Sequence, residues 1–269
     1  MLEPKIKIVQ EAADYVIVDK PAGVLTHPTQ ACEKDTLINV LLKKYRGIKK
    51  VGDSPERPGI VHRLDKEASG LLVIARTQEM FEHLKQQFQD RTIEKEYTVL
   101  VYGKMFKEHG VIDFAIDRGK EGRMVSRPKT DLLSVDKVGS AQPGKEAITE
   151  YFLEKTIGRF SLLRVKIHTG RMHQIRAHMF AFNHPVVGDS LYLNRKLIKK
   201  NQPKLDRLFL HSAKLCLSDL AGEKKCFESQ MPEELKGYLK DIGYYVKRSF
   251  SRNLITVWWR QGLGDKRVA

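Results

Sequence analysis

Two short segments of the sequence gather residue types that could do chemistry. The first runs from His62 to Gly70 and places a carboxylate, Asp65, in one short segment with an imidazole and a guanidinium. Loops of this kind often form the rim of a site, and a positioned carboxylate can act as a nucleophile or a base. By composition alone, an Asp in this setting is more often a solvated loop residue or a helix N-cap than a catalytic group.

The second segment is the run from Thr169 to His178. Here His173 and Arg176 lie three residues apart, so a helix would place both on one face, opposite an apolar stripe of Met172, Ile175 and Met179. An amphipathic helix with a basic solvent side fits the same spacing. Spacing therefore marks both segments as candidates without choosing between a site and a surface.

The elements that must position these segments can be read from hydrophobic periodicity and turn residues. In the first half, the pattern predicts strands at Asp14–Lys20, Gly70–Ala75, Lys95–Tyr102 and Val111–Ile116, a helix capped by Asp35, and a helix capped by Thr77. In the second half, it predicts hairpins from Ala147–Lys155 with Phe160–His168 and from Leu208–Leu217 with Lys224–Phe227, and helices from Gly170 to about Phe182 and at Glu233–Lys240. The polar stretch Asp117–Gly144 is expected to be a long surface loop. Hairpins with a few inserted helices predict an α+β fold on a largely antiparallel sheet.

The whole-chain composition limits the class of protein. The 269 residues, 41% of them hydrophobic, can bury a sizeable core, and the formal net charge of +15 favours a polyanionic partner. The longest apolar run, Leu71–Ala75, is too short to span a membrane, and Met1–Gln10 lacks the apolar core of a secretion signal, so a cytoplasmic protein is expected. Cys32, Cys216 and Cys226 have no C-x-x-C spacing, which predicts free thiols and no zinc site.

Taken together, the motifs resemble the RluA family of RNA pseudouridine synthases. The family signature His-Arg-Leu-Asp-x-x-Thr-Ser-Gly-Leu is matched by the run from His62 to Leu71, with Ala68 in place of Thr. The resemblance continues, in the family's order, at Lys20–Gly23, Lys95–Tyr97, Gly144–Ala147, Gly170–Arg176, His184–Asp189, Leu191–Tyr192 and Leu210–His211. Met172 replaces a usual Thr, and Asn183 stands at a position that is commonly Gly, where its tolerance of left-handed backbone geometry suits a turn.

The resemblance implies the pseudouridine synthase fold over residues 1–240, with a basic C-terminal extension over 241–269, and it implies roles for individual residues. Asp65 would be the nucleophile, Tyr97 the platform on which the target base stacks, and Arg176 the ion-pair partner of Asp65. Substrate contacts are expected from Arg63, His62, Arg171, His173 and Gln174. Such an enzyme needs no cofactor, nucleotide or metal. Its partner would be ribosomal or transfer RNA, with no membrane, and a monomer is the default expectation.

Two rival classes are weighed against this reading. A metal-dependent nuclease should present several carboxylates near its site, whereas these motifs offer mainly Asp65 and Asp189. A non-catalytic RNA-binding or ribosome-assembly factor on the same fold should have lost Asp65, Tyr97 or Arg176, and all three are present. Three basic clusters are candidates for an RNA-facing surface: Lys43, Lys44, Arg46, Lys49 and Lys50; Arg195, Lys196, Lys199, Lys200, Lys204 and Arg207; and Lys247, Arg248 and Arg252.

Overall fold

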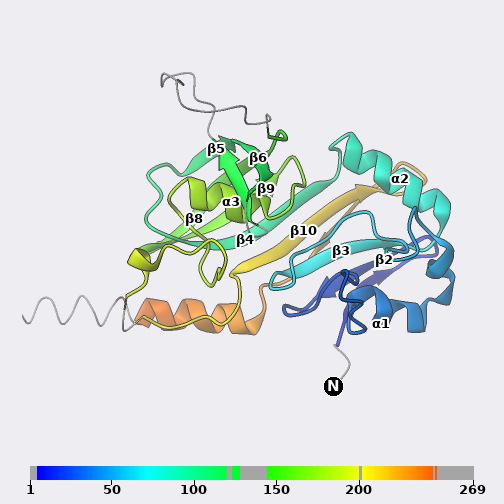
Figure 1. The fold of residues 1–269 in the computed structure, drawn as a ribbon, viewed down its shortest axis with the longest axis horizontal. Helices are drawn as coiled ribbons and strands as arrows, with labels where there is room; N and C mark the ends of the chain where they lie inside the picture. Colours follow the sequence, from blue (N-terminus) through cyan, green and yellow to red (C-terminus); the bar gives the residue numbers. More distant parts are fainter. Residues whose placement is uncertain (1–4, 120–122, 128–143, 200–201, 245, 247–269) are drawn as a thin grey trace, which may run out of the picture.

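A mixed β-sheet runs through the molecule in the computed structural model, which describes residues 5–119, 123–127, 144–199, 202–244 and 246 (Figure 1). Its nine strands are β1 (Lys7–Glu11), β2 (Tyr15–Lys20), β3 (Ser69–Ala75), β4 (Glu94–Tyr102), β5 (His109–Asp113), β8 (Ile148–Ile157), β9 (Phe160–Ile167), β10 (Leu210–Ser218) and β11 (Lys224–Glu228). They lie in the order β1-β2-β3-β10-β4-β9-β8-β5, with β11 paired to β10. A separate two-stranded ribbon consists of β6 (Ala115–Arg118) and β7 (Met124–Arg127).

The pairings between described strands are antiparallel except for one. Strands β3 and β10 run parallel, and they pair only through Ser69 with His211 and Gly70 with Ser212. Gly70 has φ of +112°, and a Cβ atom there would lie 2.3 Å from the carbonyl oxygen of Ser212, so this close approach requires glycine. The α+β class with a largely antiparallel sheet is thereby confirmed.

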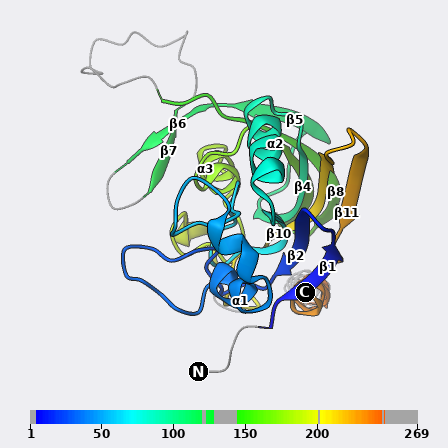
Figure 2. The ribbon, with the colours of Figure 1, turned by 90° about the vertical axis from the view of Figure 1, so that its right-hand side faces the viewer.

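The sheet has an apolar core on each face because its strands alternate. On one face, α1 (Leu37–Lys44) and α3 (Gln174–Ala181) pack with residues such as Val16, Leu72 and Val99 (Figure 2). On the other face, the alternate residues pack against α2 (Gln78–Gln89) and against the helix at residues 233–244. Short 3₁₀ helices at Arg46–Lys50 and Arg195–Leu197 complete the described helical elements. The loop before β3, from the first half of the chain, and the loop before α3, from the second half, lie together on the face that carries α1 and α3.

Most predicted elements are found within a few residues of their expected places, but two helix starts differ. Thr77 caps α2 as expected, since its hydroxyl accepts a hydrogen bond from the Met80 N–H at 3.2 Å. The N-cap of α1 is Thr36 rather than Asp35, and Thr36 Oγ1 accepts from the Asn39 N–H. Helix α3 begins at Gln174 rather than near Gly170, because residues 169–173 form a loop that the Gln174 side chain closes.

The prediction of free thiols is wrong for two of the three cysteines. Cys216 and Cys226 form a disulfide, and they are direct partners in the register of β10 with β11. Their Cα atoms are 4.1 Å apart, so the hairpin brings the two sulfur atoms together without a C-x-x-C spacing. Cys32 is free and exposed.

Several expectations fall partly outside the described residues. The predicted loop Asp117–Gly144 contains the strand β7, while residues 120–122 and 128–143 are not described. The helix at residues 233–244 crosses the predicted boundary at residue 240, and residues 247–269 of the extension lie outside the described range. None of the helices in the described ranges is long and apolar enough to cross a membrane.

Candidate active site

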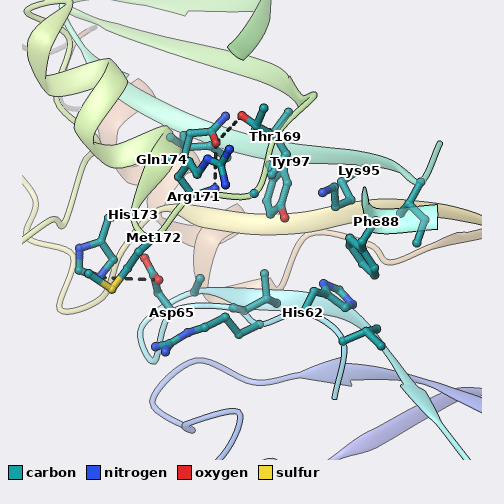
Figure 3. A pocket seen from close by; sticks show the side chains of 18 of the residues that line it. His62, Asp65, Phe88, Lys95, Tyr97, Thr169, Arg171, Met172, His173 and Gln174 are labelled. Carbon is teal, nitrogen blue, oxygen red and sulfur yellow. Dashed lines mark hydrogen bonds and ion pairs between the residues drawn. The ribbon is translucent and has the colours of Figure 1, made fainter. Parts of the chain in front are cut away.

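A cavity of about 630 Å³ opens on the face that carries α3, between the loop before β3 and the loop before α3 (Figure 3). All eight sequence-predicted site residues line it: Asp65, Arg176, Tyr97, Arg63, His62, Arg171, His173 and Gln174. The volume falls in the range of pockets that hold small organic ligands, which includes a nucleoside. Asp65 is the one carboxylate among the described residues that line this cavity.

Asp65 meets the guanidinium of Arg176 in the cavity. Arg176 Nη1 donates a hydrogen bond to Asp65 Oδ2 at 2.9 Å. The opposite edge of the same guanidinium holds Asp189, with Nε donating to Oδ2 at 2.7 Å and Nη2 donating to Oδ1 at 2.9 Å. Because two bonds to Asp189 fix the plane of the guanidinium, Nη1 can point only toward Asp65.

Asp189 is itself fixed by the turn on which it lies. Its Oδ1 accepts the backbone N–H groups of Leu191 and Tyr192, both at 2.9 Å, and its side chain has no exposed surface. Burial acts to lower the pKa of Arg176, but the hydrogen bond and charge of Asp189, helped by Asp65, raise it above the ordinary value. Arg176 is therefore a permanent cation beside Asp65.

His173 lies at the start of α3 on the other side of Asp65. Its Nε2 is 3.8 Å from Asp65 Oδ1, and its Nδ1 is 3.2 Å from the hydroxyl of Tyr192. Burial lowers the pKa of His173, an effect that the charge of Asp65 opposes only in part. The imidazole is therefore mainly neutral at pH 7 and adds a polar contact near the carboxylate rather than a second full charge.

Tyr97 reaches the cavity from the middle of β4 (Figure 3). It is 6% exposed, and burial, together with the charge of Asp65, raises its pKa far above the ordinary value. The phenol therefore keeps its proton at neutral pH and cannot serve as a base there. A planar ring in this position can support a flat ligand by stacking.

Gln174 and Arg171 make contacts that hold the loop before α3. Gln174 Oε1 accepts from Thr169 Oγ1 at 2.7 Å and from the Arg171 N–H at 3.0 Å, while its Nε2 donates to the Ile148 carbonyl and to Thr149 Oγ1, both at 3.0 Å. Arg171 Nε donates to the Glu146 carbonyl at 3.0 Å. Both side chains line the cavity, and in this structure their hydrogen bonds shape the loop.

His62 and Arg63 differ in their surroundings although they are adjacent. His62 Nε2 accepts the Val73 N–H at 3.1 Å, its ring packs on Phe88 with centroids 4.8 Å apart, and burial lowers its pKa to about 3. The imidazole of His62 is thus uncharged at neutral pH and forms part of the cavity wall. Arg63 is exposed at the rim, where a guanidinium can meet a phosphate.

Sequence reasoning missed one residue that positions the site, Lys20. This lysine has no exposed surface, and its Nζ donates to the carbonyls of Pro21, Val24, Lys66 and Ala68 at 2.7 to 3.2 Å. Two of these carbonyls belong to the loop that carries Asp65. The signal available in the sequence was a lysine that ends a buried strand immediately before Pro-Ala-Gly.

The substitution Lys20→Met is expected to loosen the loop that carries Asp65. It removes the donor from buried carbonyls, and leaving such an acceptor unpaired costs about 1–3 kcal/mol each. We expect a lower free energy of unfolding, measured by urea denaturation, and a reduced kcat with RNA. The matched variant Lys236→Met removes a half-buried lysine that pairs with Glu233 on the helix at residues 233–244, and it should change neither quantity appreciably. An unchanged stability in Lys20→Met would contradict the positioning role.

The three departures from the family signature leave the site intact. Asn183 has φ of +64°, the left-handed geometry expected of it. Ala68 is buried, and its carbonyl accepts from Lys20. Met172 lines the cavity and is 37% exposed. Among the described residues, no group of three or more His, Cys, Asp or Glu side chains is placed to hold a metal ion.

Comparison with known proteins identifies the family. The model of the RNA pseudouridylate synthase family matches residues 14–181, and this chain belongs to that family. An uncharacterized RNA pseudouridine synthase of Aquifex aeolicus is 42% identical over 189 residues, which cover 70% of this chain and 56% of that protein. The chain thus spans little more than half the length of this relative.

Two further relatives extend the likeness over most of the chain. Ribosomal large subunit pseudouridine synthase D of Borreliella burgdorferi is 36% identical over 238 residues, covering 88% of this chain and 68% of that protein. The solved structure of human RNA pseudouridylate synthase domain containing 1 superposes with a TM-score of 0.63 at 25% identity, covering 85% of this chain and 84% of that one. Members of the family isomerise uridine to pseudouridine, and the fold is that of their catalytic domain.

Proposed function

We propose that this chain converts specific uridines to pseudouridine in structured RNA, with Asp65 as the nucleophile. The observation that carries the proposal is the arrangement at the cavity floor: one carboxylate, paired at 2.9 Å with an arginine whose other edge is fixed by a fully buried aspartate. A carboxylate held in a fixed direction is what nucleophilic attack requires. Nothing else in the reaction has to be supplied, because the product is an isomer of the substrate.

The geometry suggests how the target nucleotide is held. A base within a helix cannot reach Asp65, so the uridine must be extruded or unpaired, at a cost of a few kcal/mol. Stacking on the Tyr97 ring can offset part of this cost, since stacking contributes about 1–3 kcal/mol per base. Arg63 at the rim can hold the flanking phosphate, or its side chain can fill the space that the extruded base leaves in the RNA helix. Asp65 then attacks the ribose anomeric carbon or the uracil ring, the bond from ribose to N1 breaks, and the base rejoins through C5.

Ribosomal RNA of the large subunit is the substrate that the relatives favour, with transfer RNA as the second candidate. The relatives from Borreliella burgdorferi and from Nitrosomonas europaea, the latter 34% identical over 93% of this chain, are both named ribosomal large subunit pseudouridine synthase D. We further propose that the protein acts in the cytoplasm as a monomer, with residues 1–240 as the catalytic domain and 241–269 as a basic extension.

The basic clusters contribute unequally to the proposed RNA surface. Arg195, Lys196 and Lys199 belong to the second cluster and lie at or near a 3₁₀ helix outside the main sheet. Arg207, from the same cluster, is only 7% exposed and donates a hydrogen bond to Ser69 Oγ at 2.7 Å, so it braces the segment after Asp65 instead of meeting phosphates. Lys44 pairs with Glu11 at 2.9 Å. The third cluster lies outside the described residues.

Purified protein incubated separately with large-subunit ribosomal RNA and transfer RNA transcripts tests the proposal. Pseudouridine should form in one of them at unchanged RNA chain length, as measured by nucleoside mass spectrometry and gel electrophoresis. Shortened RNA would indicate a nuclease. The non-catalytic binding factor would be favoured if the protein bound RNA tightly but formed no pseudouridine in either transcript. The same would hold if it formed no new pseudouridine in total RNA isolated from a deletion strain.

A further inference from the structure

Lys95 occupies the cavity without a role in the arrangement around Asp65. It lies on β4 two residues before Tyr97, so alternation along the strand points both side chains into the same space, as Figure 3 shows. It is 8% exposed. Its Nζ lies 5.0 Å from the centroid of the Phe88 ring, and a Cβ atom on Gly170 would be 3.8 Å from it. The ammonium is therefore held between α2 and the loop before α3.

The charge of Lys95 has no counter-ion in the described part of the chain. No hydrogen bond or ion pair of its Nζ exists among these residues, and the one carboxylate that lines the cavity is committed to Arg176. A buried ammonium without an acceptor is costly, and such groups cluster where a ligand supplies the missing partner. The phenyl ring of Phe88 offsets only a small part of that cost.

The proposed reaction creates negative charge on the uracil. If Asp65 bonds to the ribose C1′, the C1′–N1 bond breaks and its electron pair passes to N1, from which it is shared with O2 and O4. If Asp65 adds to C6 instead, the C5=C6 pair moves toward the C4 carbonyl and places the charge on O4. Rejoining through C5 returns the carboxylate, releases the C5 proton and places a proton on N1. Both routes place electron density on a uracil carbonyl oxygen before the base is rejoined.

We propose that Lys95 is a further catalytic residue, whose ammonium donates to a uracil carbonyl oxygen and stabilises the negative charge that develops on the detached or attacked base. This inference rests on the proposed function. Lys95 stays protonated throughout, so the step consumes no proton and no co-reactant. Preorganised donors aimed at developing charge in a water-poor site are among the largest contributions to catalysis.

The test compares Lys95→Met, Lys95→Gln and Lys95→Arg with the wild-type protein on the same RNA. Lys95→Met should lower kcat about 10²- to 10³-fold, the usual effect of removing one such donor, and Lys95→Arg should recover much of the loss because it keeps the charge. RNA affinity, measured by filter binding in an Asp65→Asn background, should stay near that of Asp65→Asn alone. Lys95→Gln keeps the test valid if the methionine variant does not fold.

The matched control is Lys224→Met. Lys224 is exposed on β11 and pairs with Glu94, whose side chain leaves β4 on the face opposite to that of Lys95. Its replacement should leave kcat unchanged. A kcat of Lys95→Met close to wild type would overturn the inference, as would a loss that falls on RNA affinity instead, which would make Lys95 a phosphate contact. Absence of pseudouridine with the wild-type protein would instead refute the proposed function itself.

The pH profile supplies a readout that a structural role would not move. Burial lowers the pKa of Lys95 to about 8, so the ammonium is present below that pH and is lost as the pH rises through it. The other charged or titratable side chains that line the cavity are His27, Arg57, His62, Arg63, Asp65, Lys85, Arg91, Tyr97, His168, Arg171, His173 and Arg176. The wild-type kcat should therefore fall above about pH 8, whereas Lys95→Arg should keep its rate. Parallel profiles in the two proteins would count against the assignment.

Discussion

Asp65→Asn is expected to abolish pseudouridine formation while the protein still folds and binds RNA. The amide has nearly the shape of the carboxylate but cannot form the covalent bond, so we expect kcat to fall at least about 10⁴-fold, as for other enzymes that lose a central reacting group. Pseudouridine formation in purified RNA, followed by nucleoside mass spectrometry, measures this directly. Thermal unfolding should show a folded protein, because Asp65 lies at the cavity and its side chain remains 16% exposed.

The control for this substitution is Asp241→Asn. Asp241 is exposed on the helix at residues 233–244, away from the cavity, and the change also removes one negative charge from a basic protein. Its activity should match wild type. If Asp65→Asn kept a kcat within an order of magnitude of the control, Asp65 could not be the nucleophile, and the role of the Arg176 pairing would need another explanation.

Arg176→Met should damage both activity and stability, which separates it from Asp65→Asn. The substitution leaves Asp189 buried with no exposed side-chain surface and without its guanidinium partner. Removing one partner of a buried ion pair typically costs about 3–5 kcal/mol. We therefore expect a large drop in the free energy of unfolding, measured by urea denaturation, together with loss of pseudouridine formation.

Arg176→Lys tests geometry apart from charge. A lysine cannot bond Asp189 through two atoms and Asp65 through a third, so the carboxylate loses its fixed direction, and a misplacement of this kind can cost about 10²-fold in rate. The matched control, Arg164→Lys, changes an arginine that pairs with Glu154 and does not line the cavity. Equal activity of the two lysine variants would show that the forked geometry of Arg176 is not needed.

The sequence predicted which residues line the site, but it did not predict the contacts that hold them in place. The types and spacing of Asp65 and Arg176 marked both as candidates, the resemblance to the family signature favoured a site over a solvated surface, and both residues line the cavity. The pairing of Arg176 with Asp189 depends on the turn that follows α3, and the contacts of Lys20 join segments 46 and 48 residues apart. Such contacts follow from tertiary structure, which local periodicity does not encode.

Two predictions from the sequence were wrong for different reasons: the start of helix α3 and the free state of Cys216 and Cys226. The late start of α3 arises because Gln174 uses its amide to close the preceding loop, an interaction with Thr169 and with strand β8 that no helix pattern reveals. The disulfide was missed although the pattern predicts a hairpin of Leu208–Leu217 with Lys224–Phe227, because the pairing of the cysteines depends on the length of the turn. Residues 219–223 separate Ser218 from its partner Lys224, and this register places Cys216 opposite Cys226.

The most direct test of the proposed function is pseudouridine mapping in cells, by carbodiimide modification and primer extension of total RNA. Three strains are compared: a deletion, the deletion carrying the wild-type gene, and the deletion carrying Asp65→Asn. We predict that at least one pseudouridine in ribosomal or transfer RNA disappears in the deletion, returns with the wild-type gene, and does not return with Asp65→Asn. Full return of that pseudouridine with the Asp65→Asn gene would contradict the central claim that Asp65 carries the reaction.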